Sequence, residues 1–597
     1  MVAGVVAIVT QLSSPGANFL LLVPIVVAEL ILLSQFALTY VVSRPLAYDT
    51  VVVESSMACD VIVAVLDEPV SVVRATMLGV RAVQNRESTV IVDHRDRPEI
   101  ASLAAEFDAV YVTGMHRCRS NLVNEALLFG TAPLVAFFDG DCVPLPHFAA
   151  ATAGYFGDPG VGFVQSRVEP INRDSLEHLA PHRHASSLDH LVIGPARGAR
   201  GAAIWQQSGS MVRRLALQGI GGLVDTVTGA ATLTSIALNR DGWSGRFHGD
   251  VVCLCVAPNT VDAHLAMRGG ESIARLRVLV RHQLSPIVSS RLTTSQRAAY
   301  LEDLSRPLGA VAYLLLFGAL IASVVSGRVP VVAPSTTTSI ATLVALGGVF
   351  VGHKVIARHS RSIGDRVRYG LRCLGVDVMA LRGLVTSRLR PGLIPPMAPE
   401  PGGIKSIASL KLLCSCCLVL DVAVIARGVA ERFATGPLSP INDSGRTTWL
   451  IGVSLAVMVA VLNVLGVIVL RRQMRVNFRL QVELAARIHG DVARVVDLTP
   501  YGLGAMTLLP MVVGDTVPMS LRVRTIRDAN VEVWASGVVR FCIPVGHEWR
   551  SGIEISDIST SDRDRLIEYC SVVHPSRHVA GRDIEVVPEQ MAFARSM

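Results

Sequence analysis

The chain has 597 residues, too many for one hydrophobic core, so two or more domains are expected. Hydrophobic residues make up 51%, charged residues only 17%, and the mean hydropathy is +0.47, a profile typical of a membrane protein with soluble parts. The net charge of +7 comes without a basic tract, which favours loop arginines facing anionic headgroups and excludes nucleic acid as a partner.

The eleven cysteines are scattered, and the sequence lacks paired CxxC motifs. Cys414, Cys416 and Cys417 lie in an apolar segment, where they are predicted to pack rather than to bind zinc. We expect reduced thiols and a cytosolic location for the soluble parts. The first apolar run lacks a basic start and a small-residue cleavage site, so a cleavable signal peptide is not expected.

Residues 1–48 are predicted to hold the first transmembrane segment. Residues 1–12 are apolar but too short to span, whereas Phe19–Val42 is long enough for a hydrocarbon core of about 30 Å. Arg44 follows this run and places its end in the cytoplasm.

Residues 49–300 are predicted to form a cytoplasmic α/β domain, because strand and helix patterns alternate from residue 60 onward. Apolar strands that alternate with helices indicate a parallel sheet with helices on both faces. The expected strands are Asp60–Leu66, Thr89–Asp93, Ala109–Thr113 and Leu134–Phe138, and the expected helices are Val70–Gln84, Pro98–Phe107 and Asn121–Phe129.

The last of these strands runs into two carboxylates, Asp139 and Asp141, with one residue between them. Carboxylates at the carboxyl end of a buried strand lie at the edge of an α/β sheet where ligands bind. Two hard oxygen ligands there suit Mg²⁺ or Mn²⁺, which takes one or two carboxylates together with a substrate's phosphates. An isolated Asp-x-Asp is more often an acidic turn, and it is the surrounding pattern that favours the metal site.

Residues 301–470 are predicted to form a second membrane block with four spans. Four is an even number, so both flanking soluble domains lie on one side, and Arg471-Arg472 marks that side as cytoplasmic. Between the second and third of these spans, residues 366–390 place apolar side chains on one helical face and arginines off it, which suits an interfacial helix. An ordinary loop helix is the alternative. The four spans are Leu308–Val325, Ile340–Ile356, Ile407–Ala426 and Trp449–Leu470.

Residues 471–575 lack long apolar runs and show short strands separated by turns, which indicates a small antiparallel barrel. Residues 576–597 are polar and are expected to form a flexible tail. The expected strands are Ala493–Asp497, Leu521–Thr525, Val531–Val539 and Gly552–Ile555.

This order of parts resembles the catalytic subunits of bacterial cellulose synthases, which are family 2 glycosyltransferases fused to a PilZ domain. The resemblance covers about residues 17–575. It implies a GT-A (Rossmann-like) domain inserted in an α-helical transmembrane region, an all-β PilZ barrel, and a multi-pass location in the bacterial inner membrane. It further implies a UDP-sugar donor, cyclic di-GMP as an allosteric ligand, and other subunits of a polysaccharide synthesis complex as partners.

The resemblance also assigns roles to donor-binding residues. Glu68 falls in the nucleotide-binding segment, and Asp93 is the surviving acid of the segment that holds uracil. Arg119 stands where the family has a diphosphate-binding Lys, and Asp139-Gly-Asp141 corresponds to the metal and diphosphate motif. The small residues expected near the acceptor are Ser208, Gly209 and Ser210.

Three motifs of the family's catalytic cycle are missing. The Thr-Glu-Asp that carries the general base is replaced by Gly229-Ala230-Ala231, with Ala231 at the base position. A general base contributes about 10²–10⁴-fold in rate, so its loss should cripple transfer. The Gln-x-x-Arg-Trp motif, which binds the acceptor, corresponds to Met267–Glu271, and the region of the gating loop reads Met397–Lys405.

A divergent active enzyme would need another base. His248 and Asp250, on the loop after Trp243, are the candidates, although a lone loop His or Asp is usually solvated surface. Asp225 is the nearest acid upstream of the replaced motif.

Two segments resemble the cyclic di-GMP motifs of PilZ domains. Arg471 and Arg475 match the linker arginines, and Asp497, Thr499 and Gly502 match the barrel motif, with Thr in place of Ser. Guanidinium groups suit this ligand because they bind phosphate bidentately and stack on guanine. Arginines directly after a span also anchor it at the membrane, and both roles can hold together.

Three functions stay open from the sequence. The first is an active, divergent polysaccharide synthase, and the second is a degenerate transferase that keeps its UDP-sugar and metal site together with a cyclic di-GMP sensor. The third is a non-catalytic cyclic di-GMP receptor or scaffold subunit. The cellulose-synthase-like architecture with weak or absent transfer is favoured.

Overall fold

The structure is a computed structural model, and it describes residues 2–14, 18–44, 57–114, 119–172, 189–224, 229–258, 261–281, 283–326 and 479–579 except 529, with a few isolated residues between 337 and 458. The last three predicted spans, the interfacial helix at 366–390, the gating-loop region and the tail beyond 579 lie outside these residues, apart from those isolated positions. Arg471 and Arg475 lie outside them as well.

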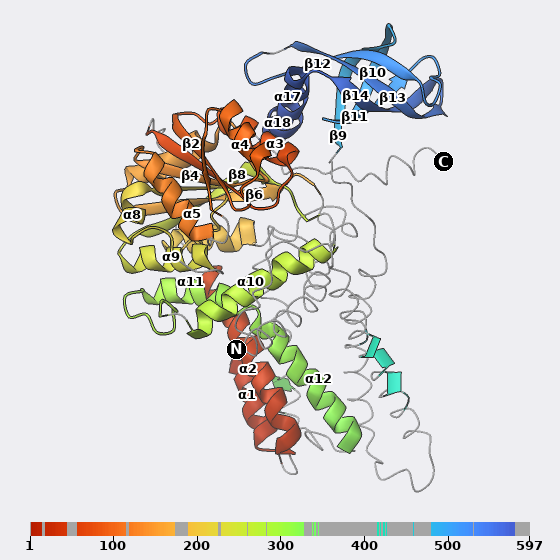
Figure 1. The fold of residues 1–597 in the computed structure, drawn as a ribbon. Helices are drawn as coiled ribbons and strands as arrows, with labels where there is room; N and C mark the ends of the chain where they lie inside the picture. Colours follow the sequence, from red (N-terminus) through yellow and green to blue (C-terminus); the bar gives the residue numbers. More distant parts are fainter. Residues whose placement is uncertain are drawn as a thin grey trace.

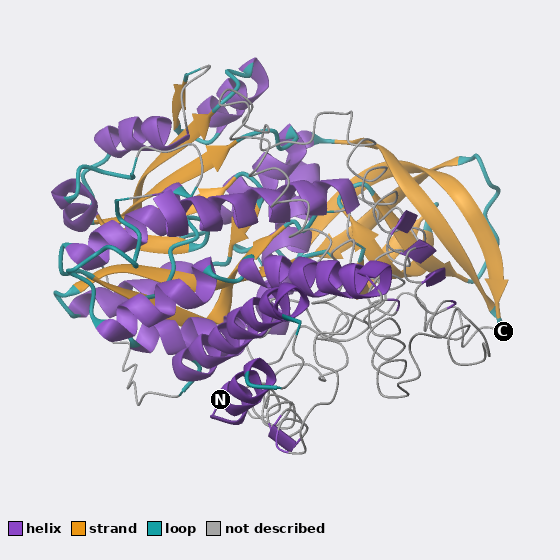
Figure 2. Ribbon diagram, turned by 90° about the horizontal axis from the view of Figure 1, so that it is seen from below, coloured by secondary structure: helices purple, strands orange, loops and turns teal. Residues whose placement is uncertain are grey.

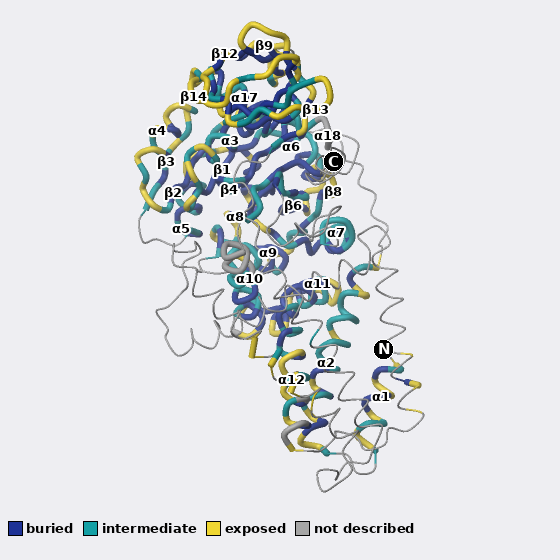
Figure 3. The backbone as a smooth tube through the Cα atoms, turned by 90° about the vertical axis from the view of Figure 1, so that its right-hand side faces the viewer, coloured by how far each residue is buried: buried dark blue, intermediate teal, exposed yellow. Residues whose placement is uncertain are grey.

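Three apolar helices form the part of the described chain opposite the barrel (Figure 1): α1 (Val2–Leu12), α2 (Phe19–Val42) and α12 (Leu308–Ser326). Helix α1 packs on α2 through Ile8, Leu22 and Val26. Helices α2 and α12 lie side by side, as Figures 1 and 3 show from two directions.

Among the described residues, α2 is the helix that is long and apolar enough to cross a membrane. Helices α11 (Thr294–Leu304) and α12 meet at an angle of 53°, and the two together qualify as a second candidate membrane span. The predicted first span is therefore found as a helix, and the multi-pass topology stays a prediction.

An eight-stranded sheet forms the centre of the α/β part, in the order β3-β2-β1-β4-β7-β6-β8-β5. The four predicted strands are present and parallel. The prediction of a parallel sheet is incomplete beyond them, because β7 runs antiparallel to β4 and β6, and β5 runs antiparallel to β8. The strands are β1 (Cys59–Val65), β2 (Arg86–Asp93), β3 (Val110–Thr113), β4 (Leu134–Asp139), β5 (Cys142–Pro144), β6 (Val161–Pro170), β7 (Ser210–Arg213) and β8 (Ser244–Cys255).

Helices cover both faces of this sheet (Figure 2), so side chains on both sides of a strand are buried. In β1, Val61 and Val63 enter one core, which contains Phe138, while Ile62 enters the other, which contains Trp205. The helices are α3 (Val70–Arg81), α4 (Pro98–Glu106), α5 (Arg119–Ala126), α6 (Phe148–Ala153), α7 (Gly194–Ala199), α8 (Arg214–Gly219), α9 (Ala230–Arg240) and α10 (Val261–Arg281), with short turns η1 (Leu127–Phe129), η2 (Gly154–Gly157) and η4 (Asp189–Ile193).

The C-terminal part is a closed six-stranded barrel, in the order β10-β11-β14-β13-β12-β9. The four predicted strands are found, each longer than expected, and β9 and β11 are additional. The strands are β9 (Leu480–Ile488), β10 (Asp491–Thr499), β11 (Gly502–Thr507), β12 (Thr516–Val523), β13 (Val531–Val545) and β14 (Glu548–Ile558).

A helical segment after the barrel connects it to the sheet. It consists of α17 (Thr560–Glu568), η5 (Tyr569–Val573) and α18 (His574–Val579), and it lies against α3 (Figure 1). Arg74 of α3 forms an ion pair with Asp564 of α17, with an N–O distance of 2.9 Å. The segment η5 also contacts β5, which directly follows the acidic pair in the chain.

Candidate functional site

The structure brings the predicted acids together at the carboxyl edge of the sheet. Strands β1 and β4 pair in parallel, with Ala64 opposite Asp139, so the loops that follow them meet. The Glu68 carboxylate accepts the backbone N–H of Leu66 at 2.6 Å and lies over Gly140, where an added Cβ would come within 3.2 Å of Glu68 Oε2. The sheet register therefore places Glu68 beside the Asp-x-Asp turn.

Arg119 begins α5, and its guanidinium contacts Asp139 through Nη2. The Nε of the same group is buried and has no hydrogen-bond acceptor in the part of the chain that the structure describes. A buried donor without a partner is costly, and an anionic ligand oxygen would satisfy it. The diphosphate role that the resemblance implies for Arg119 stays a prediction.

The acids at this edge repel one another. Burial, the Asp139 carboxylate and the Glu68 carboxylate together raise the pKa of Asp141 to about 8. Burial also raises the pKa of Glu68. A bound dication would stabilise the charged forms of these carboxylates.

The donor atoms fit a hard divalent ion. Ligand atoms of Asp139, Asp141 and Cys142 lie within 4.8 Å of one another, and two of the three are carboxylate oxygens. Mg²⁺ and Mn²⁺ prefer oxygen ligands and fill the remaining positions with water or phosphate. The two aspartates would thus hold the ion, while the Cys142 sulfur is too soft a ligand for it.

Asp93 ends β2, as the sequence predicts, and is held by local hydrogen bonds. It is fully buried at the end of β2, and its carboxylate accepts the Arg97 backbone N–H at 2.7 Å and the Tyr111 hydroxyl at 3.0 Å. Burial acts to raise the pKa of Asp93, but the hydrogen bonds from Arg97 outweigh it and lower the pKa. Arg97 in turn donates to the Glu68 carbonyl at 2.8 Å, so Asp93 positions the Glu68 loop. Its contact with uracil stays a prediction.

The small-residue segment is attached to the end of β4. The Asp139 N–H donates to Ser208 Oγ at 3.0 Å, and the Gly209 N–H donates to the Phe137 carbonyl at 2.9 Å. Gly209 has a φ of +65°, and an added Cβ would lie 2.7 Å from the Val168 side chain, so only glycine fits. Ser210 is fully buried and accepts from Trp205 Nε1 at 2.6 Å. Of the two serines, Ser208 therefore lies beside Asp139, whereas Ser210 is a buried residue at the start of β7.

The predicted base position lies in the first turn of α9. Ala231 follows Gly229, the N-cap residue, and α9 contains no acidic residue. Asp225, the nearest acid upstream, lies outside the described residues.

The two alternative bases lie on β8. His248 is buried, with Nδ1 3.3 Å from the Tyr155 hydroxyl, and burial lowers its pKa. The charged neighbours that act on it are Asp250 and His147. The Asp250 side chain is 88% exposed. Asp250 is thus a solvent-exposed surface residue, as expected for a lone acid. His248 differs from that expectation, because it is buried next to Tyr155.

The predicted nucleotide motif of the barrel is an ionic cluster. The Asp497 carboxylate is buried on β10 and pairs with Arg479 at 3.0 Å and with Arg550 at 3.1 Å. Thr499 Oγ1 accepts from the Tyr501 N–H at 3.2 Å and donates to the Gly502 carbonyl at 3.0 Å. Sequence reasoning missed Arg479 and Arg550, because the barrel closes around positions that are distant in the sequence.

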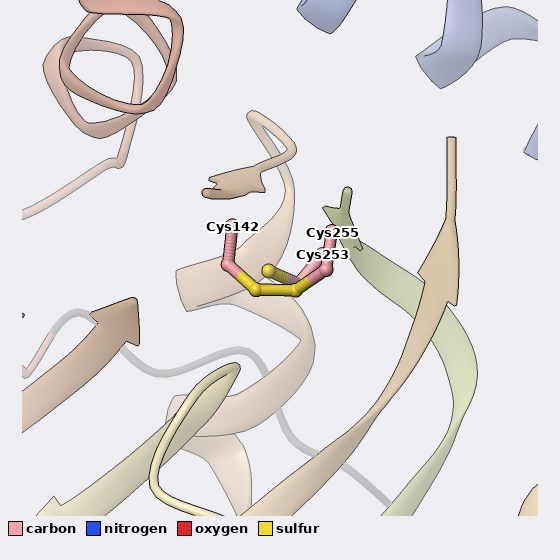
Figure 4. A group of neighbouring side chains, drawn as sticks. All are labelled: Cys142, Cys253 and Cys255. Atoms are coloured by element: carbon pink, nitrogen blue, oxygen red, sulfur yellow. A yellow bond between two sulfur atoms is a disulfide. The ribbon is translucent and has the colours of Figure 1, made fainter. Parts of the chain in front are cut away.

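The sequence predicts reduced thiols, but one pair of cysteines in the described part of the chain is oxidised to a disulfide. Cys142 of β5 and Cys255 of β8 form a disulfide, with the free thiol of Cys253 beside it (Figure 4). The two residues are 113 positions apart in the sequence and lie directly opposite each other in the β5–β8 pair.

Comparison with known proteins finds relatives for part of the chain. It is homologous over part of its length to cellulose synthases. It is 26% identical over 263 residues to "Putative cellulose synthase 2" of Komagataeibacter xylinus (42% of this chain and 17% of the relative). It is 27% identical over 258 residues to the cellulose synthase catalytic subunit [UDP-forming] of Xanthomonas axonopodis pv. citri (40% of this chain and 34% of the relative). The chain thus spans about a third or less of these relatives' length. No protein-family model matches it.

Among the solved structures that resemble part of this chain are two glycosyltransferases. A mannosyltransferase from Pyrobaculum calidifontis, in complex with GDP-Man and Mn²⁺, has a TM-score of 0.43 at 17% identity, covering 62% of this chain and 100% of that one. Glucosyl-3-phosphoglycerate synthase from Mycobacterium tuberculosis, in complex with Mn²⁺ and UDP-glucose, has a TM-score of 0.26 at 15% identity, covering 38% of this chain and 80% of that one. The homology to cellulose synthases is drawn from the sequence relatives alone.

Proposed function

We propose that this chain is a membrane-embedded, cellulose-synthase-like family 2 glycosyltransferase that binds a UDP-sugar with Mg²⁺ or Mn²⁺ and responds to cyclic di-GMP, with transfer weak or absent. The observation that carries the donor half of the proposal is the convergence of Glu68, Arg119, Asp139 and Asp141 at one edge of the sheet. Its cellular setting would be the bacterial inner membrane, with several spans, cytoplasmic soluble parts and further synthesis subunits as partners.

The residues at this edge divide the work of holding a nucleotide diphosphate. Asp139 and Asp141 would bind the metal, which supplies charge neutralisation for the leaving diphosphate. Arg119 already contacts Asp139, and its spare Nε can donate to a diphosphate oxygen. Ser208 accepts from the Asp139 backbone and thereby fixes the direction in which this carboxylate leaves β4. Glu68 lies beside the turn at Gly140, which is held by hydrogen bonds from its own N–H to the Ala64 carbonyl and from the Thr76 hydroxyl to its carbonyl.

The weak-transfer half of the proposal depends on Ala231. A methyl group stands where relatives in the family place the proton acceptor, and the sequence of α9 contains no acid. His248 is buried against Tyr155, and burial lowers the pKa of its imidazole, which makes it a weaker proton acceptor. With no carboxylate at the base position, donor binding would proceed without efficient activation of an acceptor hydroxyl.

The test is calorimetric titration of the purified full chain with UDP and UDP-glucose, with and without Mg²⁺ or Mn²⁺. We expect metal-dependent binding that is lost in Asp139→Ala and kept in Asp241→Asn, a matched loss of an exposed carboxylate on the same sheet domain. A UDP-release assay on the same preparation should show little turnover. Equal UDP affinity with and without metal would contradict the donor site, and rapid turnover would contradict the proposed loss of catalysis.

The regulatory half of the proposal is supported by the Asp497 cluster. Arg479 and Arg550 converge on one buried carboxylate, so two guanidinium groups are already gathered where the resemblance expects a dianionic nucleotide. Titration with cyclic di-GMP tests this: binding should weaken strongly in Arg479→Ala and remain in Arg487→Ala, which removes an arginine from β9 of the same barrel. Unaltered binding in Arg479→Ala would contradict the assignment.

A further inference from the structure

Three cysteines meet beside the acidic edge of the sheet. Strands β5 and β8 are antiparallel, with Cys142 opposite Cys255 and Pro144 opposite Cys253. Residues i and i+2 of a strand face the same side, so Cys253 and Cys255 both face the side on which Cys142 lies. Their three sulfur atoms lie within 4.8 Å of one another, and Figure 4 shows the Cys253 sulfur next to the Cys142–Cys255 bond.

We propose that in the reduced protein Cys142, Cys253 and Cys255 bind one thiophilic cation of the zinc class. Thiolate sulfurs select Zn²⁺ and similar soft or borderline ions, whereas the neighbouring carboxylates select Mg²⁺ or Mn²⁺. Once the disulfide is reduced, three sulfurs on adjacent strand positions can supply three corners of a tetrahedral site and leave the fourth for a non-sulfur ligand. Clustered cysteines on the cytoplasmic side of a membrane are more often metal ligands or redox centres than permanent disulfides.

The disulfide in the structure is then the oxidised counterpart of this site. Two equivalents of a small thiol reduce the Cys142–Cys255 bond to two protein thiols and are themselves joined into one small-molecule disulfide. The three cysteines then release their protons as the cation binds. In the reverse direction, a disulfide-type oxidant takes up two electrons from Cys142 and Cys255 and expels the cation.

The position of the site gives it an effect on the donor edge. Strand β5 begins one residue after Asp141, so an ion or a disulfide that ties β5 to β8 also restrains the turn that carries Asp139 and Asp141. Cys142 belongs to both groups, because its sulfur also lies within 4.8 Å of ligand atoms of the two aspartates. The experiment therefore has to separate a sulfur site from a carboxylate site.

Zinc content is measured on the purified full chain after reduction with a phosphine, loading with Zn²⁺ and removal of free metal. We expect about one tightly held zinc per chain. Cys253→Ser and Cys142→Ser should each weaken zinc binding more than about tenfold. Cys59→Ser, a fully buried cysteine in β1 of the same sheet, should leave it unchanged. Asp139→Ala should also retain zinc.

Two further measurements do not depend on how the variants fold. Co²⁺ in place of zinc should give a sulfur-to-metal charge-transfer absorption, and treatment of the wild-type chain with diamide should release the ion until a reductant restores binding. Absence of bound zinc in the reduced chain would overturn the proposal. So would zinc binding that survives in Cys253→Ser, or that disappears in Asp139→Ala, since the ion would then belong to the carboxylates.

Discussion

Metal affinity at the acidic edge should depend steeply on pH. Asp141 has a pKa of about 8, raised by burial, by Asp139 and by Glu68, so its protonated form dominates below that value. A metal ion binds the carboxylate and must displace the proton, so affinity falls as the pH falls through 8. Each pH unit costs up to about tenfold, which makes up to about a hundredfold between about pH 8 and about pH 6. Above about pH 8 the affinity should level off.

The sign of this effect can be tested with two neighbouring charges. Glu68 raises the pKa of Asp141 and Arg119 lowers it. Glu68→Gln should therefore move the midpoint of the affinity profile to lower pH, and Arg119→Ala should move it to higher pH, by about one unit each. Two substitutions at the same site then give opposite displacements, which a general loss of folding does not produce.

The assay is calorimetric titration with Mg²⁺ at saturating UDP, repeated in buffers of different ionisation enthalpy. At about pH 7 the binding of one ion should release close to one proton, and Asp141→Asn should abolish this release together with most of the affinity. Asp241→Asn serves as the control. A flat profile without proton release, or a shift of both variants in the same direction, would refute the assigned coupling.

Three further predictions concern the base position, the sheet and the barrel. Ala231→Asp should raise the rate of metal-dependent UDP release. The increase should be smaller than the contribution of a full general base, about 10²–10⁴-fold, because the acceptor motif stays altered. A coupled UDP assay measures the rate, with Ala231→Asn as the control. Arg214→Met removes the ion-pair partner of the buried Asp60 carboxylate, which lies at 2.5 Å, and leaves the hydrogen bonds from Ser88 and the Ala132 N–H. It should cost about 3–5 kcal/mol in denaturant unfolding, with the UDP affinity of the folded chain unchanged. Asp497→Ala should reduce cyclic di-GMP affinity at least about tenfold by calorimetry, and an unchanged affinity would count against the motif.

The part of the fold that was predictable from sequence is the part with the strongest local signal. Strands β1 and β4 and the second half of β2 are buried on both faces, so they appear as short apolar runs. β8 contains Arg246, His248 and Asp250 and therefore lacks such a run, although it pairs with β6 over most of its length. β5 has three residues, too few for any periodicity. Its existence depends on pairing with a strand more than a hundred residues away.

The site was predictable to a similar extent. Asp139 and Asp141 follow from the position of carboxylates at a strand end, and Glu68 and Arg119 follow from the resemblance. Arg97 was not found, because a surface-like Arg-Pro-Glu segment gives no signal that its guanidinium bonds the Asp93 carboxylate and the Glu68 carbonyl.

On the proposed function, the donor-binding residues and the altered catalytic motifs fall on different structural units. Glu68, Arg119 and Asp139 come from the ends of β1 and β4 and from the start of α5, where parallel strand pairing alone brings them together. The segments expected to carry the base and the acceptor motif, at residues 229–231 and 267–271, lie on α9 and α10.

These two helices share one hydrophobic cluster, which contains Leu233 and Ile236 of α9 together with Val278 and Leu279 of α10. On the proposed function, the altered catalytic motifs are thus confined to α9 and α10, on the acceptor side. The donor-binding residues at the strand ends are retained. A chain altered in this way should bind donor without acceptor. A soluble oligosaccharide acceptor should therefore leave the calorimetric affinity for UDP unchanged, whereas a coupled increase would show that the helical pair still forms an acceptor site.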